Sequence, residues 1–208
     1  MLTTPRLIAI ALCAALNVAV GSAVYLVKLP VYLDSIGAIL CALLLASHRR
    51  VAFVCTLISA LTSTLVTGVL INPFLPWFVG TDLTIALVSA FVTSRGADTF
   101  RARPMEPYRF GGLVLLYGIL TGIAAAIVSA PVVAFVFGGV TGSGTALIVG
   151  VLLKSGEQLF RATLTSGLVA DPIDKTLQVL IAALLFRATP SDFVAMVRGT
   201  PARGATGA

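Results

Sequence analysis

The sequence predicts an all-α integral membrane protein with six transmembrane helices and one additional amphipathic or re-entrant helix on the outer side of the membrane. Only 11% of the 208 residues are charged, whereas a soluble domain of this length carries about 25% charged residues. The mean hydropathy is +1.06. Apolar runs long enough to cross a hydrocarbon core about 30 Å thick recur along the chain.

Six apolar runs define the predicted spans, and charged residues, glycine or proline separate them. The spans cover residues 6–27, 32–47, 51–71, 73–95, 110–137 and 171–187. The first run is longer than the roughly 7–15 apolar residues of a signal peptide, so we expect it to remain as a helix. Residues 1–190 then form a single membrane domain, and residues 191–208 form a short, frayed cytoplasmic tail.

Residues 145–169 are expected to form the additional outer helix between the fifth and sixth spans. Lys154, Gln158, Arg161 and Thr165 recur at the spacing of one helical face, with apolar residues behind them. This polar stripe is either a solvated face or the inner side of a lid over a bound solute, and the sequence leaves both readings open.

The basic residues predict the orientation of the bundle in the plasma membrane. With both termini in the cytoplasm, ten basic residues lie inside and four outside, and ten plus four gives the 14 of the sequence. The inner ten are Arg6, Arg49, Arg50, Arg95, Arg101, Arg103, Arg109, Arg187, Arg198 and Arg203, and the outer four are Lys28, Lys154, Arg161 and Lys175. If residues 145–169 also crossed the membrane, the division would weaken to eight against six. The excess of positive charge on cytoplasmic loops therefore favours six spans.

Composition and spacing disfavour several other classes of function. The basic residues lie at the ends of apolar runs and form no patch, so we expect no nucleic-acid partner. Cys13, Cys41 and Cys55 lie inside apolar runs without a CxxC pair, and His48 is the only histidine. We therefore expect no metal site, no cofactor and no disulfide framework.

The glycine-rich stretch at residues 138–144 is not predicted to bind ATP. Gly139 and Gly144 have the spacing of a phosphate-binding loop, but Thr145 and Ala146 follow where Lys and Ser or Thr are required. We expect the glycines to reverse the chain at the membrane surface, with Ser143 or Thr145 capping the next helix.

Seven residues are candidates for binding a solute on the outer side. Asp82 lies within a span, where an ionisable group is costly and usually faces a cavity or a partner. Asp171-Pro172 has the pattern of a helix start, and Lys175 would then stand in a first turn, where the helix dipole disfavours a cation. Lys175 thus needs an anion, either Asp171 or a group outside its helix. The seven candidates are Tyr32, Asp34, Trp77, Asp82, Arg161, Asp174 and Lys175.

Simpler interpretations remain open for most of these residues. Asp34 and Asp174 are also typical acids at helix starts, and Tyr32 and Trp77 are typical interfacial aromatics. If Lys175 and Arg161 converge on one pocket, they would favour a ligand with a carboxylate, a phosphate or an electron-rich carbonyl.

The first span also carries small residues on one face. Ala11, Ala15 and Ala19 recur every four residues, a spacing that lets another helix approach closely within a membrane. This face is a candidate contact with a partner subunit.

Taken together, the chain resembles an S component, the substrate-binding subunit of energy-coupling-factor (ECF) type vitamin transporters, over nearly its whole length. The resemblance rests on six spans in about 200 residues, the alanine face, the stretch Leu-Pro-Val-Tyr-Leu-Asp-Ser-Ile-Gly at residues 29–37, the loop at 138–144, and Asp174-Lys175 opening the last span. It implies a membrane-embedded binder for a vitamin, a vitamin precursor or a nucleobase-like micronutrient, with no catalytic activity of its own.

The resemblance also implies partners and sites. The subunit would dock on a coupling transmembrane subunit that carries two cytoplasmic ATPases, with Ala11, Ala15 and Ala19 at that contact. The seven candidate residues would then bind the solute. The alternative is a membrane sensor module that signals to a separate soluble partner. An intramembrane enzyme is disfavoured, because the sequence lacks a His pair, a GxSxG elbow and paired aspartates in facing spans.

Overall fold

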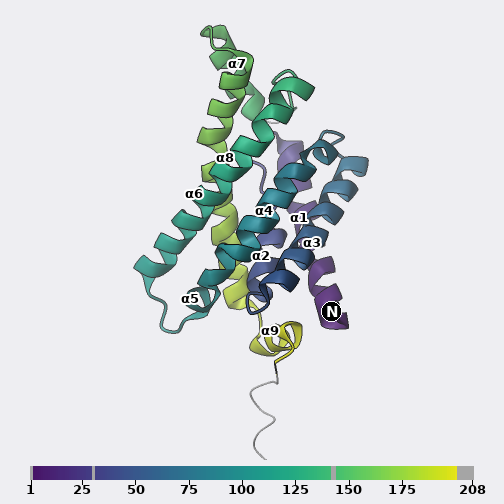
Figure 1. Ribbon diagram of the computed structural model, residues 1–208, viewed down its shortest axis with the longest axis vertical. Coiled ribbons are helices and arrows are strands. Elements are labelled where there is room, and N and C mark those ends of the chain that lie inside the picture. Colours follow the sequence, from purple (N-terminus) through teal and green to yellow (C-terminus); the bar gives the residue numbers. More distant parts are fainter. Residues whose placement is uncertain (1, 30, 142–143, 201–208) are drawn as a thin grey trace, which may run out of the picture.

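The computed structural model describes residues 2–29, 31–141 and 144–200, which fold into helices without any strand in these ranges (Figure 1). The expectations that concern Pro30, Gly142, Ser143 and residues 201–208, including Arg203, lie outside them. The elements are α1 (Thr4–Val27), α2 (Ile36–Leu44), α3 (Arg49–Leu70), η1 (Leu75–Phe78), α4 (Val79–Phe91), η2 (Thr93–Gly96), α5 (Ala97–Arg101), α6 (Pro107–Pro131), the π-helical η3 (Val132–Val136), α7 (Thr145–Lys154), α8 (Leu159–Ala188) and α9 (Ser191–Arg198).

Four of the described helical runs are long and apolar enough to cross a membrane. They are Thr4–Val27, Arg49–Leu70, Leu75–Arg101 and Pro107–Val136. A fifth span results if α8 and α9, which meet at a bend of 102°, are counted as one. The all-helical membrane class is supported by these spans, but the predicted number of six is not confirmed.

The second predicted span, residues 32–47, contains a helix that is too short to cross a membrane. Only α2 is helical there, and its nine residues rise about 14 Å, roughly half of a hydrocarbon core. Eight of the nine are buried, and α2 packs against α1, α3, α4 and α8. Gly37 permits the contact with α1, because a Cβ atom there would lie 1.9 Å from the carbonyl oxygen of Cys13. Thus α2 is the centre of the apolar core.

The predicted boundary between an outer helix and the last span is wrong. Residues 145–169 do not form one helix, because α7 ends at Lys154 and a turn containing Gly156, with φ +93°, leads into α8. In turn, α8 continues through Pro172 without a break, so Asp171-Pro172 lies inside a helix. The proline is accommodated at a close contact with α6, where Gly122 leaves no room for a Cβ atom, which would lie 2.4 Å from Pro172.

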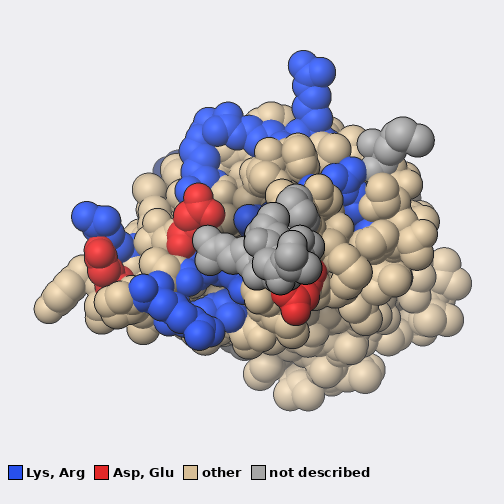
Figure 2. All heavy atoms as spheres, turned by 90° about the horizontal axis from the view of Figure 1, so that it is seen from below, with Lys and Arg blue, Asp and Glu red and all other residues tan. Residues whose placement is uncertain are grey.

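Basic side chains gather at the end of the bundle that carries α9, whereas α7 lies at the opposite end (Figures 1 and 2). All of α9 was expected to belong to a frayed tail, but Val194 and Val197 are buried. Arg198 donates hydrogen bonds to the carbonyl oxygens of Leu43 and Leu44, at 3.1 and 3.0 Å. Because the last carbonyls of a helix lack partners within it, Arg198 completes the C-terminus of α2.

Candidate functional site

The backbone between α1 and α2 is irregular and is held by side chains of other helices. Asp174 on α8 accepts hydrogen bonds from the backbone N–H groups of both Tyr32 and Leu33, each at 3.0 Å. Gln178, one turn further along α8, accepts a bond from the N–H of Ser35 at 2.9 Å. Backbone N–H groups that are buried outside a helix require such partners, because a buried unpaired N–H group is costly. Residues 31–35, which we call the irregular segment, are therefore fixed to α8.

Lys175 lies between two carboxylates in this arrangement. Its Nζ atom is 3.1 Å from Asp34 Oδ1, on the irregular segment, and 3.0 Å from Asp174 Oδ2. Only 5% of its side chain is exposed. Lys175 lies in the middle of α8 and not in a first turn as predicted, and its anionic partners are Asp34 and Asp174 rather than Asp171. The pairing joins the irregular segment to α8 a second time.

The surroundings of Asp34 lower the pKa of its carboxyl group. Burial by itself raises its pKa, because a charged group loses hydration. The ion pair with Lys175 and a hydrogen bond from the hydroxyl of Ser35 outweigh burial, so the pKa of Asp34 lies below its usual range. Asp34 is one-third exposed, which keeps it in reach of a ligand.

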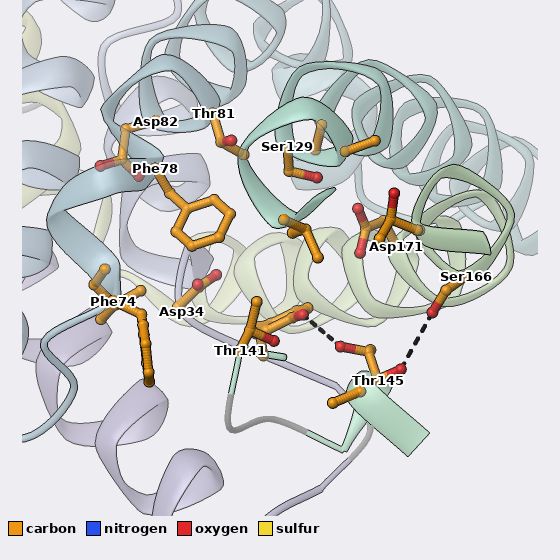
Figure 3. Close-up of a pocket in the computed structure, with 18 of the residues that line it drawn as sticks. Asp34, Phe74, Phe78, Thr81, Asp82, Ser129, Thr141, Thr145, Ser166 and Asp171 are labelled. Atoms are coloured by element: carbon orange, nitrogen blue, oxygen red, sulfur yellow. Dashed lines mark hydrogen bonds between the residues drawn. The ribbon is translucent and has the colours of Figure 1, made fainter. Parts of the chain in front are cut away.

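A cavity adjoins the irregular segment in the half of the bundle that carries α7 (Figure 3). Its empty volume is about 930 Å³, including the part that opens to solvent. The walls come from the irregular segment, α3, η1, α4, α6, η3, α7 and α8, so residues far apart in sequence meet there. Its charged lining residues are Asp34, Asp82, Asp171 and Lys175. A smaller cavity of about 560 Å³ adjoins it, shares Asp34 and Asp82, and is also lined by Lys28.

The glycine-rich loop and the start of α7 close one side of the cavity. The Tyr32 hydroxyl lies 2.7 Å from that of Thr145, and the Ser166 hydroxyl donates to the Thr145 carbonyl at 3.3 Å (Figure 3). Thr145 is the first residue of α7 and not its cap. Gly139, with φ +87°, allows the loop to turn inward against Val149. Gly139, Thr141 and Thr145 thus line this side of the cavity.

The structure brings together most of the predicted solute-binding residues. Tyr32, Asp34, Asp82 and Lys175 line the cavity, and Asp174 lies directly behind them as the acceptor for the irregular segment.

Two of the predicted residues lie elsewhere. Trp77 is 60% exposed, with its ring 6.3 Å from that of Phe137. The side chain of Arg161 is 71% exposed and pairs with Glu157 at 3.6 Å. Arg161 and Lys175 therefore do not converge, and the reason for expecting an anionic ligand is removed.

Several lining residues were missed by reasoning from the sequence. Asp171 lines the cavity from the middle of α8, although its pattern with Pro172 is typical of a helix start. Phe74 and Phe78 contribute aromatic walls and pack on Phe137, with ring centroids 5.0 and 6.0 Å apart. The only feature of the sequence that points to the two phenylalanines is that they lie close to Asp82 along the chain. That feature does not show whether they face the cavity.

Two acidic groups of the cavity, Asp82 and Asp171, form no ion pair within the described part of the chain. Asp171 is only 7% exposed and lines the cavity. Oδ2 of Asp82 is buried without a hydrogen-bond partner, and so is the hydroxyl of neighbouring Thr81. Buried polar atoms of this kind cost free energy unless a ligand or water meets them.

The alanine face of α1 points away from the core. Ala11, Ala15 and Ala19 are all exposed, whereas Cys13, Ala14 and Asn17 on the opposite face are buried. The face is accessible to a partner helix, and the partner contact itself stays a prediction.

No protein-family model matches the chain, and neither a curated protein nor a solved structure matches it.

Proposed function

We propose that the chain is the substrate-binding subunit, or S component, of an ECF-type uptake transporter for a small micronutrient. The observation that carries the proposal is the polar cavity beside an irregular segment within an apolar helical bundle. Its walls combine apolar and aromatic side chains with a few polar and charged groups, as is typical of sites for small organic molecules. Broken backbone at membrane depth is typical of solute sites in transporters, because its free polar groups line the cavity.

The chain binds its solute on the outer side of the membrane, and ATP hydrolysis in partner subunits drives transport. The cavity lies toward the α7 end, and the arginine-rich end carries α9 (Figures 1 and 2). By the positive-inside rule the arginine-rich end faces the cytoplasm of a cell whose plasma membrane holds the bundle. The exposed alanine face of α1 then docks on a coupling transmembrane subunit with two cytoplasmic ATPases.

Co-purification with mass spectrometry tests this function. The chain is extracted in mild detergent, its partners are identified, and native mass spectrometry measures the mass of any bound solute. Two ATPases and a coupling subunit, together with a bound micronutrient, are expected. A soluble signalling protein in place of the ATPases would support a sensor module, and the absence of both a solute and ATPases would refute the proposal.

Reporter fusions test the orientation. A reporter fused after Arg198 or inserted between Arg101 and Arg109 is expected to be active on the cytoplasmic side, and one beside Lys154 on the external side. These sites lie at opposite ends of the bundle, so the two readings must differ. A cytoplasmic reading beside Lys154 would reverse the orientation and place the cavity on the wrong side for uptake.

A further inference from the structure

The charges around the cavity do not balance. Asp34, Asp82 and Asp171 line it, and Lys175 is the single cation among its described lining residues. Lys175 is already shared between Asp34 and Asp174, at 3.1 and 3.0 Å. Asp82 and Asp171 form no ion pair with any cation of the described residues.

Asp82 and Asp171 are placed to receive a ligand. They come from α4 and α8, and Figure 3 shows them on different sides of the cavity with Phe78 and Ser129 between them in the view. Asp171 is more than nine-tenths buried and forms no ion pair in the described structure, while Oδ2 of Asp82 is buried without a hydrogen-bond partner. An ionised carboxyl group in such a site needs a positive charge or hydrogen-bond donors nearby.

We propose that the cavity takes an organic cation: a small molecule with a protonated nitrogen and a flat ring, whose N–H donors reach Asp82 and Asp171. This inference deepens the proposed function and rests on it. The aromatic walls favour the same class, because Phe74 and Phe78 line the cavity and ring faces attract cations.

A set of three isosteric probes tests the charge of the ligand. Tryptamine, tryptophol and indole-3-acetate carry one, zero and minus one charge on nearly the same skeleton. Their dissociation constants are measured by calorimetry on the protein in nanodiscs. Because a charge-assisted hydrogen bond contributes more than a neutral one, tryptamine is expected to bind about 10- to 150-fold more tightly than tryptophol.

Isosteric variants locate the effect. Asp171→Asn and Asp82→Asn keep the side-chain shape and remove the charge, so each is expected to reduce the preference for tryptamine. Asp192→Asn, at an exposed position on α9, removes the same charge far from the cavity and should leave the preference unchanged. A preference that survives both cavity variants would overturn the assignment.

Other results overturn the inference without touching the proposed function. One such result is that tryptophol or indole-3-acetate binds as tightly as tryptamine or more tightly. A second is that none of the three probes binds, and a third is a co-purified solute without a protonatable nitrogen. In each case the solute and the ATPases of the co-purification experiment still decide whether the chain is a transporter subunit. A co-purified solute with a protonated nitrogen, lost on Asp171→Asn, would support both conclusions.

Discussion

Replacing Lys175 by methionine tests whether this residue is a structural link rather than a direct ligand for the solute. Methionine keeps most of the buried stem and removes the charge from between Asp34 and Asp174. Breaking a buried ion pair by removing one partner costs about 3–5 kcal/mol, because the remaining charge stays buried without compensation. Asp174 is 1% exposed and Asp34 is 32% exposed, so the cost falls mainly on Asp174 and the lower part of this range is expected.

The free energy of unfolding is measured by titrating mixed micelles with sodium dodecyl sulfate and following helix content by circular dichroism. Lys154→Met is the matched control, because it makes the same chemical change at an exposed position on α7. Exposed substitutions usually change stability by less than about 0.5 kcal/mol. If the two variants lose the same stability, Lys175 does not hold the irregular segment.

A double-mutant cycle separates the link from general damage. Adding Asp34→Asn to Lys175→Met removes one of the two uncompensated carboxylates. The double variant is therefore expected to be more stable than Lys175→Met alone, with a coupling of about 0.5–3 kcal/mol. Asp174 keeps its hydrogen bonds from Tyr32, Leu33 and Gln178 in that variant. Simple addition of the two single effects would show that Asp34 and Lys175 act independently.

Two further substitutions test the packing and the docking face. Gly118→Val is expected to lower the free energy of unfolding by about 1–3 kcal/mol, because a Cβ atom there would lie 2.3 Å from Thr176 on α8. Gly112→Val, on the same helix with open space around it, is its control, and equal losses would contradict the close contact. Ala15→Trp is expected to abolish uptake by cells that contain the coupling module while solute binding by the isolated chain persists. A parallel loss of binding would assign this face to the internal fold.

The membrane class and the approximate ends of three long helical runs follow from the local sequence pattern. Residues 6–27, 51–71 and 110–137 were predicted as spans and correspond to α1, α3 and the continuous run of α6 and η3, within a few residues. In these runs the apolar length and the flanking basic residues are local properties, so the sequence contains the whole signal. The same holds for the concentration of arginine at one end of the bundle.

The last third of the chain could not be predicted in this way. Asp171-Pro172 has the pattern of a helix start, because proline fits the first turn and an acid favours it. The structure places both inside α8, where α6 approaches so closely at Gly118 and Gly122 that the tertiary contact outweighs the local preference. The error concealed Asp171, which was interpreted as a cap and is a buried group facing the cavity.

The irregular segment explains why the predicted second span failed and why the site was nevertheless partly found. Residues 32–47 are apolar enough to span, but Tyr32 and Leu33 bond to Asp174, which follows them by more than 140 residues. Hydropathy depends on side chains alone. It therefore cannot show whether a backbone N–H group forms its hydrogen bond within a helix or with a distant side chain. Charged residues within other apolar runs do indicate such an interruption, because burying them costs free energy unless they find partners. Asp82 was chosen for that reason, and Lys175 was chosen because a cation in a first helical turn needs an anion. Lys175 pairs with Asp34 and Asp174, and these three residues join the irregular segment to α8 beside the cavity. In an apolar bundle, the charged residues that composition makes rare are therefore the best guide to where a helix is interrupted.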